Sequence, residues 1–296
     1  MFSKGSSTTS LDPVLAPLSR AAAERLVRLA QAAAATRGLR VRYDGAGALI
    51  TADGAVAGLT NLARSVAGQP SQHWQELVED HFDRLVRWVG HPPLPPANPL
   101  GEVYLRLVTA QNIPADWCDQ LPQFLPGVHM MAATQVDGAI ALHLEPDRLG
   151  MSKSEVLTAG LANLRRLTDT VEYLMFDDAV VAQIGDSPFA ASRALVLDTV
   201  LRETLFTENP SYGVLASIPT RDRLLLHVIR DESLVAALAL MSTLAVDAYT
   251  NHPGPISPHV YFVHDNDWER LTDTDGTTLR PDLSPQVLQT IHPLLE

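Results

Sequence analysis

Residues 212–251 limit the fold of this chain more than any other segment, because they have the pattern of a β-hairpin followed by a helix. An apolar run ends at Pro219, the polar residues 220–222 form a corner, a second apolar run follows, and helical spacing begins at Asp231. The same order of signals recurs along the chain. The sequence therefore predicts an α+β fold built from repeated ββα units, with largely antiparallel hairpins packed against helices. Such a pattern identifies a fold and no chemistry.

The other segments support this prediction. Further hairpins are predicted at residues 39–51, 128–145 and 171–184, and single strands at 103–107 and 259–264. Helices are predicted at residues 11–33, 59–66, 71–89, 152–164 and 188–205, and a short one begins at Ser284. The capping box of Ser152 and Glu155 gives one of these helices a clear start.

A proline-rich segment divides the chain. Residues 91–101 hold five prolines, which exclude helix and inner strand. The charge also changes there, since residues 1–90 hold 10 Lys and Arg against 8 Asp and Glu, while residues 91–296 hold 12 against 26. We expect an N-terminal α+β domain at 1–90, a linker at 91–101, and a C-terminal α+β domain of ββα units at 102–296. The Pro-x-x-Pro spacings also fit a polyproline II ligand, but a stiff spacer is the preferred interpretation.

The composition limits which cellular compartment and which kinds of partner are expected. The single cysteine, Cys118, allows no internal disulfide and no multi-cysteine zinc site, which fits a reducing compartment. The acidic C-terminal part repels phosphate backbones and so disfavours nucleic acid. The N-terminus is polar, and no apolar run approaches the roughly 18 to 20 residues of a membrane span. We expect a cytoplasmic protein without a membrane or nucleic-acid partner.

Three segments resemble the YtpQ-like family of bacterial domains of unknown function. They are LGMSKSEVLTAGLANLRRL at 149–167, SPFAASRALVLDTVL at 187–201 and, most specifically, SIPTRDRLLL at 217–226. The N-terminal part is similar to the family in a diverged form, so the resemblance covers most of the chain. It implies an α+β fold and supplies no activity or catalytic residue.

The familiar motifs of catalysis and metal binding are weak or missing. His73, Glu76 and Asp80 lie at helical spacing, but an amphipathic helix needs a polar face and explains them better than a metal site does. Residues 273–276 resemble part of a calcium loop, but Leu271 would occupy the first ligand position, so a turn is preferred. The sequence has no Walker A, G-x-G-x-x-G or G-x-S-x-G motif. It predicts no catalytic residue, metal or cofactor.

A set of arginines is the remaining candidate site. Arg165, Arg193 and Arg221 with Asp222 lie in the segments that carry the family resemblance. Guanidinium groups bind oxyanions in a bidentate manner, so these residues could converge on an anionic ligand or on a partner's carboxylates. The preferred alternative is structural, with Arg221 and Asp222 at a turn and the others paired with local acids.

Two functions of different classes follow. The first is a cytoplasmic, non-enzymatic protein-interaction module that acts as an adaptor, a chaperone-like or a regulatory component, because sheet edges and helix faces are available for partners. The alternative is an enzyme or a binder of a small anionic ligand that uses the arginine-lined site. Self-association into a homo-oligomer is a third interpretation.

Overall fold

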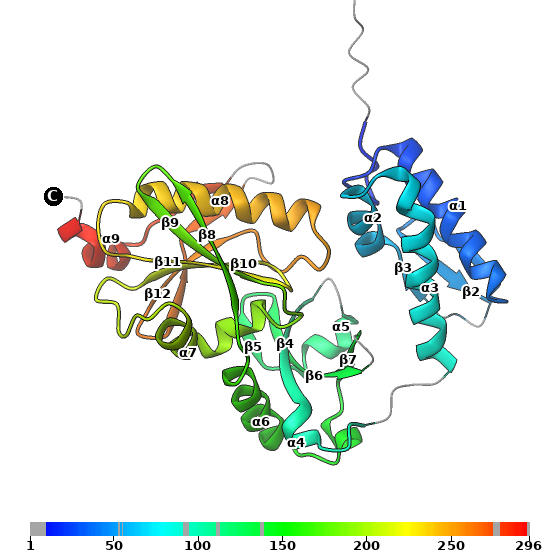
Figure 1. Ribbon diagram of the computed structural model, residues 1–296, viewed down its shortest axis with the longest axis horizontal. Helices are drawn as coiled ribbons and strands as arrows, with labels where there is room; N and C mark the ends of the chain where they lie inside the picture. Colours follow the sequence, from blue (N-terminus) through cyan, green and yellow to red (C-terminus); the bar gives the residue numbers. More distant parts are fainter. Residues whose placement is uncertain are drawn as a thin grey trace, which may run out of the picture. The chain divides into compact units, whose positions relative to one another are not determined.

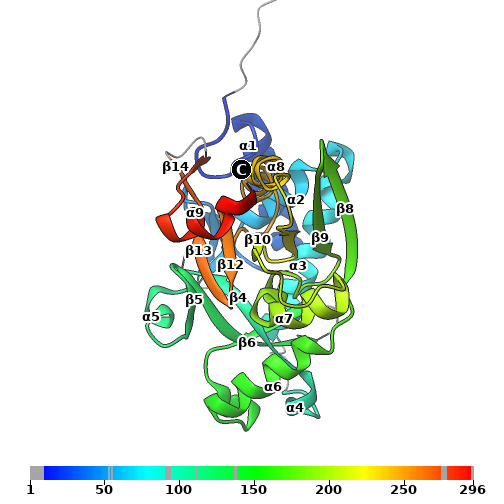
Figure 2. The same cartoon turned by 90° about the vertical axis from the view of Figure 1, so that its left-hand side faces the viewer.

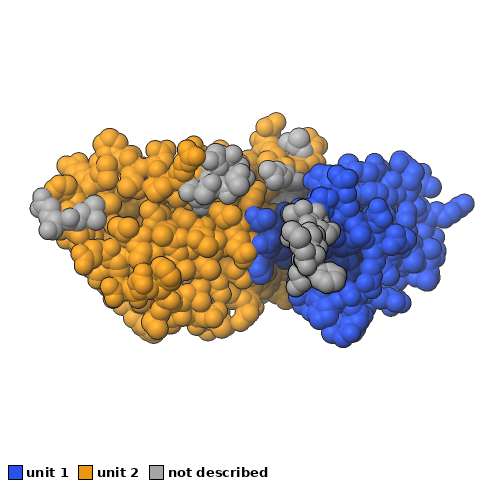
Figure 3. Space-filling model, turned by 90° about the horizontal axis from the view of Figure 1, so that it is seen from above, with its two compact units in different colours: residues 1–93, 250–253 blue, residues 94–249, 254–296 orange. Residues whose placement is uncertain are grey.

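The chain has an α+β fold in which helices cover antiparallel sheets (Figure 1). The computed structural model describes residues 10–52, 54, 56–90, 95–110, 113–136, 139–274 and 279–294. Its contacts divide the chain into two compact units, residues 1–93 with 250–253 and residues 94–249 with 254–296 (Figure 3). Independent folding of the predicted domains at 1–90 and 102–296 stays a prediction. Limited proteolysis should cut near the linker and leave two stable fragments.

Unit 1 is a three-stranded sheet packed against helices. Its elements are α1 (Arg20–Thr36), β1 (Val41–Tyr43), β2 (Ala48–Thr51), β3 (Val56–Gly58), α2 (Thr60–Ala67), the 3₁₀ turn η1 (Ser71–His73) and α3 (Trp74–Gly90). The strands run in the order β1-β2-β3, and the predicted hairpin of β1 and β2 is confirmed. Leu26, Leu49 and Phe82 are fully buried and bring α1, β2 and α3 into one apolar core.

The prediction of a helix from residue 11 is wrong, because α1 begins only at Arg20. Pro13 and Pro17 lack the N–H that a helix interior requires. The Asp12 carboxylate accepts from the N–H groups of the two residues after Pro13, which holds a turn there instead. Ser19 then caps the helix by accepting from the N–H of Ala22.

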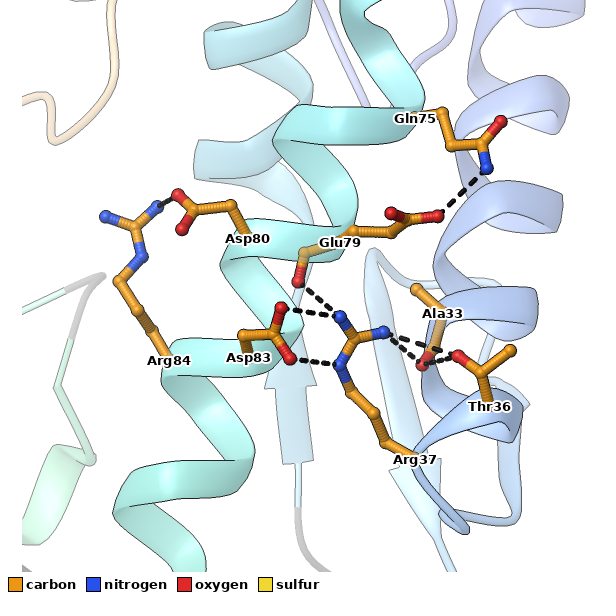
Figure 4. A network of polar contacts seen from close by, with 8 residues as sticks. All are labelled: Ala33, Thr36, Arg37, Gln75, Glu79, Asp80, Asp83 and Arg84. Carbon is orange, nitrogen blue, oxygen red and sulfur yellow. Dashed lines mark hydrogen bonds and ion pairs between the residues drawn. The ribbon is translucent and has the colours of Figure 1, made fainter.

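Arg37, at the end of α1, forms hydrogen bonds and an ion pair with α3 (Figure 4). Its guanidinium group donates to both carboxylate oxygens of Asp83 at 2.8 Å and to the carbonyls of Ala33 and Glu79 at 2.9 Å. The hydrogen bond to Asp83 is the main reason that the pKa of this carboxyl lies below its ordinary value. The contact joins residues 46 positions apart, so sequence spacing gives no sign of it.

The smaller sheet of unit 2 is built around β6. Its strands are β4 (Val103–Thr109), β5 (Gln123–Leu125), β6 (Val128–Val136) and β7 (Ala139–His143), and β6 pairs antiparallel with each of the others. The helical elements beside it are α4 (Pro99–Glu102), α5 (Ala115–Cys118), the 3₁₀ turn η2 (Pro146–Leu149) and α6 (Lys153–Arg165). The capping box of Ser152 and Glu155 is present at the start of α6. The predicted turn at 137–138 lies outside the described residues.

The larger sheet of unit 2 has the strand order β13-β12-β10-β11-β9-β8. Its strands are β8 (Thr170–Phe176), β9 (Ala179–Gly185), β10 (Val214–Thr220), β11 (Arg223–Val228), β12 (Val260–His264) and β13 (Asp267–Arg270). The helix α8 (Leu234–Asn251) covers one face (Figure 1), and residues of β10 and β11 are buried on both faces. The predicted hairpins β8–β9 and β10–β11 are confirmed. The remaining elements are β14 (Thr272–Thr274), β15 (Leu279–Pro281), α9 (Pro285–Ile291) and the 3₁₀ turn η5 (His292–Leu294).

The predicted single helix at 188–205 is wrong. The segment is a 3₁₀ helix, η3 (Ala191–Val196), one α-helical turn, α7 (Leu197–Thr199), and a π-helical turn, η4 (Val200–Thr204). Long-range bonds hold this irregular path, because the Ser192 hydroxyl accepts from the Leu107 N–H and Arg193 is bound to Asp169. The ββα unit as a repeat along the whole chain stays a prediction.

One helix among the described residues, α8, is long and apolar enough to cross a membrane by length and composition alone. Five of its residues are buried, and α8 contributes to the same apolar cluster as strands β9 to β12. A helix that covers a sheet inside a protein core passes the same test, so this feature is weak evidence for a membrane span.

Candidate functional site

Arg193, one of the predicted site residues, is engaged in a buried ion pair. Its side chain is 1% exposed. Nε and Nη2 donate to the two carboxylate oxygens of Asp169 at 2.8 and 2.7 Å, and Nη1 donates to the Leu164 carbonyl. Thr204 donates to the same carboxylate at 2.7 Å. All three nitrogens of Arg193 are hydrogen-bonded and its side chain is buried, so this residue joins α6, η3 and the start of β8 and is shielded from a ligand in solvent.

Arg165 and Arg221 differ from each other in their charge partners. Arg165 lies at the end of α6 and pairs with Asp198 at 3.5 Å on the surface. Arg221 lies at the exposed corner between β10 and β11 and has no ion pair within the described part of the chain. Each of Arg165 and Arg193 therefore has its own carboxylate, whereas Arg221 retains an unneutralised charge.

The corner at Arg221 and Asp222 is held by local and long-range bonds. The Thr220 hydroxyl donates to the Asp222 carboxylate at 2.7 Å, and the Arg221 N–H donates to the Gly254 carbonyl at 2.8 Å. Gly254 has a positive φ of 69°, and a Cβ there would collide with the Arg221 side chain. The arginine stem thus lies directly over a glycine, which fixes its position at the corner.

Arg106 is a further charged residue beside this corner, and sequence reasoning missed it. It lies on β4, is 7% exposed, and its Nη1 has no hydrogen-bond partner among the residues that the structure describes. Burial, and to a smaller extent the charge of Arg221, lower the pKa of Arg106 to about 10, while the charge of Asp222 opposes the shift. The guanidinium carbon lies 5.9 Å from the centre of the Phe189 ring. The sequence contained a sign of this site, because Arg106 is the one charged residue in the otherwise largely apolar strand β4.

The outer edge of β8 is a second candidate site (Figure 2). β8 pairs with β9 in unbroken register from Thr170 opposite Gly185 to Phe176 opposite Ala179. Its other edge pairs with no strand in the described ranges, so one row of backbone N–H and C=O groups is left for another chain. The strand contains no proline and no lysine, and Glu172 is its only charged residue.

Apolar side chains are exposed beside this free edge. Tyr173 is 56% exposed and Met175 is 78% exposed. Both lie on the same face of the strand, and Val180 of β9, also exposed, stands opposite Met175. Phe176 is exposed on the other face. We call Tyr173, Met175 and Val180 the hairpin patch. This patch was not predicted from the sequence, because the apolar residues of β8 have the pattern of a buried strand.

A cavity of about 640 Å³ also lies in unit 2, between the two sheets. Its lining includes His259, Tyr261, Trp268 and Arg270. Burial lowers the pKa of His259 and raises that of Tyr261. The Tyr261 hydroxyl is already bonded to Ser257 at 2.8 Å, and Arg270 lies 3.7 Å from Asp273. His259 Nδ1 lies 3.4 Å from the Thr272 hydroxyl. Each of these polar side chains therefore has a partner of its own, and among the described residues they are not arranged as a nucleophile with its base.

The weak metal candidate of α3 is accounted for by other contacts. Asp80 pairs with Arg84 at 2.7 Å (Figure 4), and His73 lies in η1, before the helix begins. Within the described ranges, no three His, Cys, Asp or Glu side chains come together in a way that could hold a metal ion.

Comparisons of the chain with known proteins identified no relative. No protein-family model, no curated protein and no solved structure matches the chain.

Proposed function

We propose that the protein is a non-enzymatic protein-interaction module and that the β8–β9 hairpin is its binding edge. The observation that carries the proposal is the free edge of β8, bordered by the hairpin patch. An extended chain added to such an edge gains main-chain hydrogen bonds, and the neighbouring side chains select its sequence. The cytoplasmic location and the relation to the YtpQ-like family belong to the proposal and rest on the sequence alone.

The edge is suited to binding because leaving it open is costly. Long, apolar edge strands attract other strands, and soluble proteins commonly protect them with lysine, proline, bulges or a covering element. β8 contains no lysine and no proline. It also has no bulge, because its register with β9 is unbroken over seven residue pairs. Large apolar side chains in water also forgo the free energy that burial would contribute, about 25 cal/mol for each Å².

Affinity purification of the tagged protein from cells tests the proposal. Tyr173→Lys places a charge in the hairpin patch and should abolish capture of the partner while the protein stays folded. Val235→Lys is the matched control, because Val235 is a similarly exposed apolar residue on α8. Equal capture by the wild type and by Tyr173→Lys would refute the β8 edge as the binding surface.

Binding of a small anion at Arg106 and Arg221 is a second candidate function. The observation that favours it is Arg106 Nη1, which is buried without a hydrogen-bond partner in the described chain. A buried charge without a partner costs several kcal/mol, and a second arginine nearby adds repulsion. An oxyanion between the two guanidinium groups would remove both costs.

Thermal unfolding with inorganic phosphate as the probe tests this second candidate. Phosphate should raise the Tm of the wild type and leave that of Arg106→Met unchanged. Without phosphate, Arg106→Met should be at least as stable as the wild type, because an apolar side chain of similar volume replaces an unpaired charge. Arg148→Met, at an exposed arginine of the same unit, is the control. An equal response of Arg106→Met and the wild type would contradict the site.

A further inference from the structure

The edge of β8 has features that suit it to pair with itself. We infer that a second copy of this chain occupies it, so that two β8 strands run antiparallel across a two-fold axis and join two six-stranded sheets into one. This inference rests on the proposed function, since it names the partner of the same edge. Three observations carry it: the direction of the free backbone groups, the position of the one charged residue in β8, and the opposite charges at the two ends of the strand.

The free backbone groups of β8 come from alternate residues. β8 and β9 are joined by the two-residue turn of Asp177 and Asp178, closed by the pair Phe176 and Ala179. Hydrogen-bonded and non-bonded pairs alternate along an antiparallel ladder, and the closing pair of a two-residue turn is a bonded one. Val171, Tyr173 and Met175 therefore direct their N–H and C=O groups toward the free edge.

A two-fold axis at Tyr173 uses all of these groups. It sets Tyr173 opposite its own copy and Val171 opposite Met175, which gives three residue pairs that each exchange two hydrogen bonds. Residues directly opposite each other share a face of the sheet. The two hairpin patches therefore meet, and Tyr173 and Met175 lose their exposure to water.

Glu172 selects this register. With the axis at Tyr173, Glu172 stands opposite Leu174 of the other copy. A shift that places the axis at Glu172 would oppose two carboxylates, which is destabilising. It would also reduce the bonded residue pairs from three to two, because Met175 would then stand opposite Asp169, which precedes β8.

The charges at the ends of β8 favour a second copy over an unrelated peptide. Asp177 and Asp178 are exposed at the end of the strand, and Arg165 and Arg166 are exposed shortly before its start. In the antiparallel pair, the acidic turn of one copy lies beside the basic end of the other. Arg166 has no carboxylate partner among the described residues, and its guanidinium group donates to the Asn163 side chain at 3.2 Å. The edge is thus complementary to itself in charge as well as in backbone hydrogen bonding.

Sedimentation equilibrium of the purified full-length protein, over a series of concentrations, tests the inference. The wild type should have twice the mass of the 32.1 kDa chain. Tyr173→Lys should sediment as a folded monomer, because two ammonium groups would then meet at the axis. Val235→Lys should remain a dimer. Circular dichroism and the Tm of each variant establish that it is folded.

A charge exchange tests the antiparallel orientation. Arg166→Glu and Asp178→Arg should each raise the dissociation constant of the dimer by about fivefold. The double variant should restore it, since the opposite charges face each other again. A lack of restoration would overturn the proposed pairing even if the protein were dimeric.

Two outcomes reject the inference and are distinct from failure of the proposed function. A wild type that is monomeric at every concentration rejects the dimer, and if Tyr173→Lys still abolishes capture of another protein, the binding edge itself is retained. Dissociation by Val235→Lys but not by Tyr173→Lys would assign self-association to α8 and reject the pairing through β8.

Discussion

The two edge strands of the six-stranded sheet, β13 and β8, differ in length and in the number of charged residues. β13 has four residues, of which Asp267, Glu269 and Arg270 are charged. β8 has seven residues and a single charge, Glu172. A short, charged edge resists the addition of another strand, whereas a long, apolar one favours it. The comparison supports the proposal that partners bind at β8 rather than at β13.

The two edge strands are also held to unit 2 in different ways. Trp268 of β13 packs edge-on against Phe124 and Tyr261, with ring centres 5.1 and 5.9 Å apart. β8 is anchored by the residue before it, Asp169, through the buried ion pair with Arg193. The side chains of β13 thus contribute to the fold of the single chain, while most of those of β8 do not.

The largest expected effect is loss of the anchor of β8. Asp169→Ala leaves Arg193 buried without its partner, so the free energy of unfolding should fall by about 3 to 5 kcal/mol. Urea unfolding measures the change. Glu172→Ala, at an exposed acid three residues later, is the control and should change the stability little. A similar small effect of Asp169→Ala would show that β8 is held by other contacts.

Removal of the anchor of β13 comes next. Trp268→Ala removes an aromatic side chain that is partly buried, and should cost about 3 kcal/mol in the free energy of unfolding. The matched change at β8, Met175→Ala, should cost within about 0.5 kcal/mol. Both are best measured in the Tyr173→Lys background, where the proposed dimer does not contribute. Equal costs would show that the side chains of the two edge strands contribute equally to the stability of the single chain.

A smaller effect concerns acid pH and His227, which lies two strands in from β8. Its Nδ1 donates to the Val180 carbonyl at 2.8 Å, and its buried Nε2 has no partner among the described residues. Burial lowers the pKa of His227 below the ordinary 6.5. As the pH falls below 6.5, His227 binds a proton more readily in the unfolded chain than in the folded chain. The contribution of this histidine to the free energy of unfolding is therefore fully present above pH 6.5 and is lost as the pH falls through the lowered pKa.

Unfolding free energies measured from pH 7.5 to 5 test this prediction. His227→Gln should reduce the loss of stability at acid pH. It should not remove the loss entirely, because burial also lowers the pKa of His81, His143 and His259. An unchanged dependence on pH in His227→Gln would assign the effect to those other histidines.

The smallest expected effect is at the charged edge. Glu269→Thr removes one of the protecting charges of β13 and should change the free energy of unfolding by no more than about 0.5 kcal/mol. The two remaining charges, Asp267 and Arg270, should keep the edge from pairing, so the oligomeric state should also stay the same. A larger assembly of Glu269→Thr, seen by sedimentation, would show that β13 is nearly as open to partners as β8.

Elements with local signals could be predicted from the amino-acid sequence. The hairpin β10–β11, the turn of Asp177 and Asp178, and the capping box at Ser152 were all predictable, because their hydrogen bonds join residues a few positions apart. Of the candidate site, the sequence identified Arg221 and Asp222 as the corner of that hairpin.

The position of a strand at a sheet edge and the pairing of charges depend on long-range packing. β8 and β10 are both largely apolar in sequence, yet β10 is buried throughout and β8 is mostly exposed, because strand order depends on pairing between distant segments. The pairing of Arg193 with Asp169 joins residues 24 positions apart, and the burial of Arg106 depends on neighbours more than 80 positions away. Contacts of this kind arise from packing, and no local period or cap in the sequence encodes them.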